Sequence, residues 1–390
     1  MPSRARILAA AAAAALLVLT GCSNAGDSGD DAEATPHGYV EGAQEKADPQ
    51  VALAYAEDGG RTLHLLDPVT EETDDVELSV AASSLHEDGR FVYAIDGATV
   101  EIVDSGRWTV DHGDHVHFYQ APAKNIGTVT LGSEVTSVAG QGGLVAIGTA
   151  DGEVRVLNRK DMEDDGKISE VGTIETNDDA GFAVPYSDGL LLARDGHIEF
   201  TDDKGGAKGA RQPCREPGGS ALLKNRVAVS CADGIVLFSL DGTAVSGEVL
   251  PYAPGHERAT AFGNRPRSNA AAAHAAHGAW ALDSSAETLS WLPAPGTVAA
   301  AFGTGRDDVM LVLDADGTLR SLRAPSGEPI ADSAIPGASG TATVVADTSR
   351  AYVNAAGTKT IAEIDYADDV RIARTLKTTS TPDLLVEVGR

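Results

Sequence analysis

Three histidines, His112, His115 and His117, lie within six residues of the sequence. On a β-strand, side chains two residues apart project from the same face, about 6.5–7 Å apart along the strand. Imidazoles at the spacing of His115 and His117 can therefore converge on one zinc ion, which binds histidine nitrogen at about 2.0–2.1 Å. Asp111 precedes the histidines and Asp114 lies among them, either as further ligands or as carboxylates that orient the imidazoles. We therefore predict a metal site within 111–117, with zinc as the metal and copper or nickel as competitors.

Further ligands for this site would have to come from elsewhere in the chain. His256, His274 and His277 are the candidates, although the alanines around the last two favour simple packing. The alternative interpretation of the 112–117 cluster is a polar hairpin loop without a metal.

The elements that must position these histidines are predicted to be β-strands. From Gln50 onward, short runs rich in Val, Leu, Ile and Ala are separated by Gly, Asp, Asn and Pro. Many neighbouring runs are joined by Asp-Gly, a pair that favours two-residue hairpins. Near copies of an Ala-Asp-Gly turn begin their Asp-Gly pairs at positions 151, 233 and 316, which are 82 and 83 residues apart.

Half of that spacing, roughly 41 residues, is the length of a four-stranded propeller blade. Residues 50–390 are long enough for about eight such units. We therefore predict an all-β fold, a β-propeller of about eight blades, with seven blades or an open solenoid as alternatives. The last strand-like segment, 383–388, is expected to pair with the first blade and close the ring, which removes free sheet edges.

The start of the chain is predicted to be an export signal. Arg4 and Arg6 precede an apolar, alanine-rich run that ends in Leu-Thr-Gly-Cys at Cys22. This ending resembles a bacterial lipobox, so we expect a lipoprotein signal peptide at 1–21 and a lipid on Cys22. The segment 22–49 has few large apolar residues and is predicted to be a flexible, acidic tether.

Composition argues against nucleic acid as a partner and predicts a disulfide. The chain carries 58 acidic and 30 basic residues, a formal net charge of −28, which argues against binding nucleic acid. Cys214 and Cys231 are the two cysteines of the body, and an even pair in an exported protein predicts a disulfide.

The motif Trp-Thr-Val-Asp-His-Gly-Asp-His-Val-His-Phe-Tyr at 108–119, on an exported propeller, resembles the zinc metallochaperones of the AztD type. The segment 38–43 is similar to lipoproteins of that kind. We expect a monomer. The resemblance implies a propeller that binds zinc at His112, His115 and His117. It also implies delivery of the zinc to the solute-binding protein of a zinc ABC transporter, from a lipid anchor on the outer face of the cell membrane.

Two other functions remain open from the residues alone. Three imidazoles with an open position could activate a zinc-bound water, as in a zinc-dependent hydrolase. A propeller that only binds other proteins, with no metal, is the other alternative. No nucleophile elbow, phosphate-binding loop or dinucleotide fingerprint is recognised in the sequence, so we expect that the protein is not an enzyme.

Overall fold

The computed structural model describes residues 42–112, 115–176, 178 and 180–390. The predicted signal peptide, the lipidation site Cys22 and the tether up to residue 41 lie outside these residues. Within the described ranges, no helix is long and apolar enough to cross a membrane.

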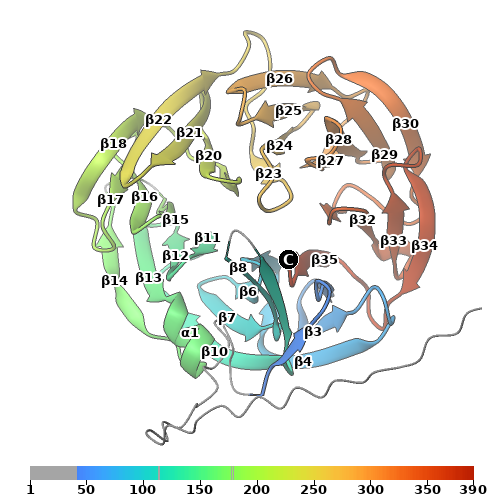
Figure 1. Cartoon of the computed structure of the whole chain (residues 1–390), viewed down its shortest axis with the longest axis horizontal. Coiled ribbons are helices and arrows are strands. Elements are labelled where there is room, and N and C mark those ends of the chain that lie inside the picture. Colours follow the sequence, from blue (N-terminus) through green and yellow to red (C-terminus); the bar gives the residue numbers. More distant parts are fainter. Residues whose placement is uncertain (1–41, 113–114, 177, 179) are drawn as a thin grey trace, which may run out of the picture. The chain divides into compact units, whose positions relative to one another are not determined.

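Eight four-stranded antiparallel sheets, each formed mainly by consecutive strands, make up most of the described chain after residue 51 (Figure 1). They are the blades of a β-propeller, which confirms the predicted fold. The first four blades, each from the innermost strand outward, contain β35 (Leu384–Val388), β2 (Ala52–Ala56), β3 (Gly60–Leu66) and β4 (Thr73–Ala82); β5 (Ser84–Glu87), β6 (Phe91–Asp96), β7 (Thr99–Asp104) and β10 (Lys124–Thr130); β11 (Val135–Gln141), β12 (Leu144–Thr149), β13 (Glu153–Asn158) and β14 (Glu170–Glu175); β15 (Ala183–Tyr186), β16 (Gly189–Arg194), β17 (His197–Thr201) and β18 (Ala207–Pro213).

The remaining four blades follow the same order. They contain β19 (Gly219–Leu222), β20 (Arg226–Ser230), β21 (Gly234–Asp241) and β22 (Ala244–Pro251); β23 (Ala261–Gly263), β24 (Ala270–Ala275), β25 (Gly278–Asp283) and β26 (Thr288–Pro293); β27 (Val298–Gly303), β28 (Val309–Asp314), β29 (Thr318–Arg323) and β30 (Glu328–Ala334); β31 (Val344–Ala346), β32 (Ala351–Ala355), β33 (Thr360–Asp365) and β34 (Arg371–Lys377). A short helix α1 (Arg159–Asp165) joins β13 to β14, and a 3-10 turn η1 (Ala356–Thr358) joins β32 to β33.

The repeated Ala-Asp-Gly turns connect the second and third strands of every second blade, which explains their spacing of two blade lengths. They join β12 to β13, β20 to β21 and β28 to β29, through three residues rather than the predicted two. Gly152 and Gly317 adopt φ of 89° and 86°, a backbone region that favours glycine.

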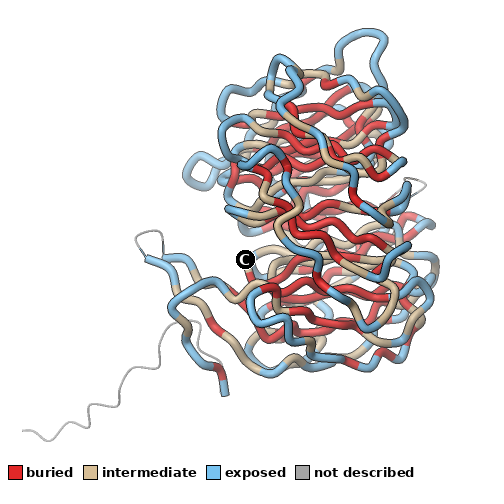
Figure 2. The backbone as a smooth tube through the Cα atoms, turned by 90° about the vertical axis from the view of Figure 1, so that its right-hand side faces the viewer, coloured by how far each residue is buried: buried red, intermediate tan, exposed pale blue. Residues whose placement is uncertain are grey.

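The C-terminal strand closes the ring, as predicted. β35 pairs antiparallel with β2, from Ala52 opposite Val388 to Ala56 opposite Leu384. Apolar side chains of neighbouring sheets pack against each other between the blades, and Figure 2 shows the buried strand interiors between exposed loops. The predicted disulfide between Cys214 and Cys231 is present and joins the ends of β18 and β20, which belong to neighbouring blades.

A ninth, three-stranded sheet interrupts the second blade. The hairpin β8 (Arg107–Asp111) and β9 (Val116–Gln120) is inserted between β7 and the outermost strand β10. The third strand, β1 (Gln44–Lys46), pairs with β9. We call β1, β8 and β9 the hairpin sheet. The tether predicted for 22–49 therefore extends too far, because Gln44–Lys46 is a paired strand. The sequence did not indicate this strand because the strand has no large apolar residue.

Candidate metal centre

The pairing of β8 with β9 decides which side chains share a face of the hairpin sheet. Val110 lies opposite His117, and Trp108 lies opposite Tyr119. Opposite residues of an antiparallel pair project from the same face, and so do residues two apart on one strand. His112 and His115, two residues beyond Val110 and before His117, therefore belong to the same face. This face carries aromatic residues at its base and histidines at its tip.

The aromatic base anchors the hairpin sheet to the second blade. The rings of Trp108 and Tyr119 stack with centroids 5.4 Å apart, and Ala43 belongs to the same buried cluster. The guanidinium carbon of Arg90 lies 4.1 Å from the centroid of the Trp108 ring, and Arg90 is itself ion-paired with Asp104. Cation–π contact and apolar burial together give the small sheet a fixed base.

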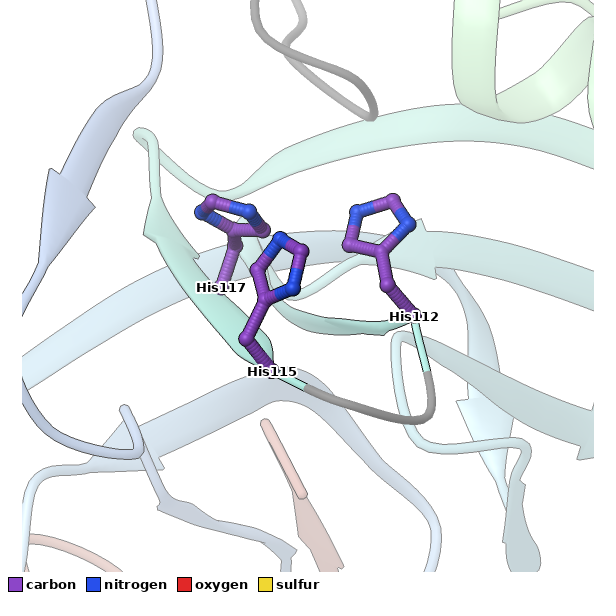
Figure 3. Close-up of side chains that lie close together, drawn as sticks. All are labelled: His112, His115 and His117. Atoms are coloured by element: carbon purple, nitrogen blue, oxygen red, sulfur yellow. The ribbon is translucent and has the colours of Figure 1, made fainter.

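The three histidines converge at the tip, as Figure 3 shows. Their ligand atoms all lie within 4.8 Å of one another, and the ring centroids are 4.8, 4.9 and 5.2 Å apart. The backbone N–H of His112 donates to the carbonyl of His115 at 3.0 Å, which holds the two ends of the loop together. The sequence prediction that His112, His115 and His117 form one group is confirmed, although β9 begins one residue after His115.

The fit to zinc can be judged from these distances. A tetrahedral zinc with bonds of about 2.0–2.1 Å needs its nitrogen ligands about 3.4 Å apart. The ligand nitrogens lie within 4.8 Å of one another, so small side-chain rotations bring them to this distance. The exposure of His112 and His115 at the tip leaves room for these rotations. Three imidazoles without a thiolate are a set of ligands that suits zinc.

Glu45 of β1 supplies a carboxylate to this group. It lies opposite Tyr119 in the β1–β9 pairing and therefore projects from the histidine face. Nδ1 of His117 lies 2.7 Å from Oε1 of Glu45. A carboxylate accepts a hydrogen bond, so Nδ1 of His117 carries the hydrogen and Nε2 remains as the ligand atom. Burial, and secondly the charge of Glu45, raise the pKa of the Tyr119 phenol, which stays protonated at neutral pH.

The structure corrects the prediction for Asp111. Asp111 lies opposite Val116 and projects from the face that turns away from the histidines. Its Oδ2 is 3.1 Å from Nη1 of Arg267, which lies just beyond β23 in the sixth blade, on the far side of the ring. The hairpin sheet therefore reaches across the ring, in agreement with the position of β8 in Figure 1. Asp114 lies outside the described residues.

None of the distant histidines joins the group. In His274, Nε2 lies 2.9 Å from the carbonyl of Val298 and Nδ1 lies 3.0 Å from the hydroxyl of Thr260. His277 is paired with Glu257 at 2.7 Å, and His256 stacks on Trp291. These contacts account for the three side chains as parts of the sixth blade, and within the described ranges the metal group consists of the hairpin histidines alone.

Two cavities lie inside the ring, and the metal group is outside both. The larger, of about 1000 Å³, is lined by residues of the innermost strands and by Arg267. The smaller, of about 620 Å³, lies beside Cys214. None of the three histidines lines either of these two cavities, and His112 and His115 are exposed.

Sequence reasoning missed Glu45 and Arg267. Glu45 is 72 residues from His117, and only the pairing of β1 with β9 brings them together. No local pattern marks either residue, because both contacts depend on elements that are distant in sequence.

Comparisons with known proteins support the fold. No family model matches the chain, and no curated protein matches it. A crystal structure of AztD from Citrobacter koseri is similar with a TM-score of 0.74, at 17% identity, over 87% of this chain and 98% of that chain. The apo structure of AztD from the same organism gives a TM-score of 0.75 at 16% identity, with the same coverage.

A less similar structure shows that the propeller fold alone does not indicate a function. Dihydro-heme d1 dehydrogenase NirN is similar with a TM-score of 0.57, at 13% identity, over 88% of this chain and 76% of that chain. A protein named as a dehydrogenase thus shares the architecture. The chain has a fold of the AztD type, and its function must be argued from the hairpin sheet.

Proposed function

We propose that the protein is an extracytoplasmic zinc metallochaperone, which holds zinc on the hairpin sheet and passes it to another protein. The observation that supports this most strongly is the convergence of His112, His115 and His117 within 4.8 Å on an exposed tip. The AztD-type resemblance of the 108–119 motif, together with the similarity of the fold, suggests the solute-binding protein of a zinc ABC transporter as the acceptor.

The proposed transfer proceeds by exchange of ligands. His112 and His115 stand exposed at the loop, whereas His117 is part of a strand and is held by Glu45. An incoming ligand of the acceptor would therefore replace His112 or His115 first, and His117 would release the metal last. Lipid attachment at Cys22 would keep the donor at the outer face of the cell membrane, where the transporter takes up its cargo.

Hydrolysis by a zinc-bound water is the less favoured function. Such catalysis needs a substrate cavity next to the metal, as well as a general base. The imidazoles line neither cavity, and the nearby carboxylate of Glu45 is already bound to His117. A carrier, in contrast, needs a site that another protein can reach.

The test is to mix the zinc-loaded chain with the cognate apo solute-binding protein and to follow the metal by stopped flow. We expect transfer to be faster than spontaneous release of zinc into a chelator, because ligand exchange avoids free zinc. The variant His256→Ala with His277→Ala serves as a matched control and should transfer normally. Equal rates for transfer and spontaneous release would refute direct delivery, and hydrolytic turnover by the loaded chain would favour the enzyme.

A further inference from the structure

The strand that brings Glu45 to the metal group is short and lies at an edge. β1 has three residues and pairs only with β9, through Gln44 opposite Gln120, Glu45 opposite Tyr119 and Lys46 opposite Phe118. Ala43, next to it, is buried in one cluster with Trp108 and Tyr119. Among the described residues, β1 is held by three paired residues, the contact of Glu45 with His117 and one small buried side chain, so its detachment costs much less than unfolding of a blade.

The contact between Glu45 and His117 has a defined effect on the metal group. Hydrogen bonding of Nδ1 to the carboxylate at 2.7 Å fixes the ring orientation and the tautomer, and it increases the basicity of Nε2. Outer carboxylates of this kind typically change metal affinity by about 10–100-fold. The side chain of Glu45 is 49% exposed and that of His117 is 25% exposed, so solvent screening places the expected effect near the lower end, about tenfold.

We propose that β1 is a latch for metal retention, with Glu45 as a positioning residue that acts through His117. While β1 is paired with β9, the carboxylate holds His117 as a strong ligand. When β1 detaches, Glu45 leaves with it and the metal is released faster. This inference rests on the proposed function, since it concerns the same three histidines.

Two variants disrupt the contact between Glu45 and His117 in different ways. Glu45→Ala deletes the carboxylate. Ala43→Asp places a carboxylate in the buried cluster of Trp108 and Tyr119, which detaches β1 and leaves Glu45 in the sequence. Each variant should release zinc about tenfold faster. Because both disable the same contact, the double variant should release zinc no faster than Ala43→Asp alone.

Two further variants separate positioning from a general structural effect. Glu45→Gln keeps an oxygen that accepts from Nδ1 but lacks the charge, so its release rate should lie between those of the wild type and Glu45→Ala. Gln44→Ala removes an exposed neighbour on the opposite face and should release zinc at the wild-type rate. NMR of nitrogen-15-labelled histidine in the metal-free protein should show the hydrogen of His117 on Nδ1 in the wild type and on Nε2 in Glu45→Ala.

The decisive measurement is the rate of zinc release into an excess of chelator. If Glu45→Ala and Ala43→Asp both release zinc at the wild-type rate, the latch is wrong, while the proposed function stands. If each accelerates release and the double variant multiplies the two effects, Glu45 acts without β1 and the latch is also wrong. If the wild type binds no zinc, both the latch and the proposed function are wrong.

Discussion

Glu387 offers a quantitative test of how the closing strand is built. It lies on β35, is 0% exposed, and neither of its carboxyl oxygens has a hydrogen-bond partner among the described residues. Nη1 of Arg390 is 3.7 Å from its Oε2. Burial raises the pKa of Glu387 from 4.5 to about 7, against the opposing pull of the Arg390 charge. We predict that Glu387→Gln stabilises the protein at alkaline pH.

The sign and size of the effect of Glu387→Gln on stability follow from the link between protonation and folding. A carboxyl whose folded pKa is raised contributes stability below its unfolded pKa and loses that contribution as the pH rises through its folded pKa. For Glu387 the loss runs from pH 4.5 to about 7. At about 1.36 kcal/mol per pKa unit, the advantage of Glu387→Gln grows by about 3 kcal/mol between about pH 4.5 and pH 8.5. With an unfolding entropy of about 2.1 cal/mol/K per residue, this corresponds to about 4 °C in melting temperature.

Differential scanning calorimetry at the two pH values measures this effect. The exposed substitution Glu328→Gln is the control and should show no such pH dependence. The reasoning is refuted if the melting temperature of Glu387→Gln does not rise relative to the wild type between the two pH values. A larger advantage at the lower pH would show that the sign is wrong.

Three other predictions concern the hairpin sheet and the disulfide. Trp108→Ala removes a ring that is only 7% exposed, and such a change typically costs about 3–5 kcal/mol in a core. Zinc titration should then show lost binding, while calorimetry should still show the unfolding transition of the propeller. Asp111→Asn should change zinc affinity less than about threefold in a competition assay, because Asp111 projects away from the histidines, and a tenfold loss would contradict this. Cys214→Ser with Cys231→Ser opens a bridge between residues 17 apart and should cost about 3 kcal/mol in denaturant unfolding.

The fold could be predicted because its signals are local and repeated. The Asp-Gly pairs at 151, 233 and 316 fall at the same turn of every second blade, so their spacing reports the blade length directly. The closure by β35 followed from the need to cover sheet edges. The length of the turns was wrong by one residue, because the register of each hairpin depends on packing that the sequence pattern does not specify.

The metal group could be predicted only as far as it is local. His112, His115 and His117 belong to one hairpin, so their spacing was informative. Asp111 was predicted as a further ligand or an orienting carboxylate, but it projects from the other face, because neighbouring residues of a strand alternate between faces. Glu45 comes from a strand that forms only by pairing with β9, and no sequence pattern marks it.

The central claim is that His112, His115 and His117 hold zinc. It is tested most directly by a competitive zinc titration of the wild type beside His115→Ala with His117→Ala. We predict one zinc bound per chain at submicromolar concentration in the wild type and in the control His256→Ala with His277→Ala, and loss of that binding in the hairpin variant. Unchanged zinc affinity in the hairpin variant would contradict the account.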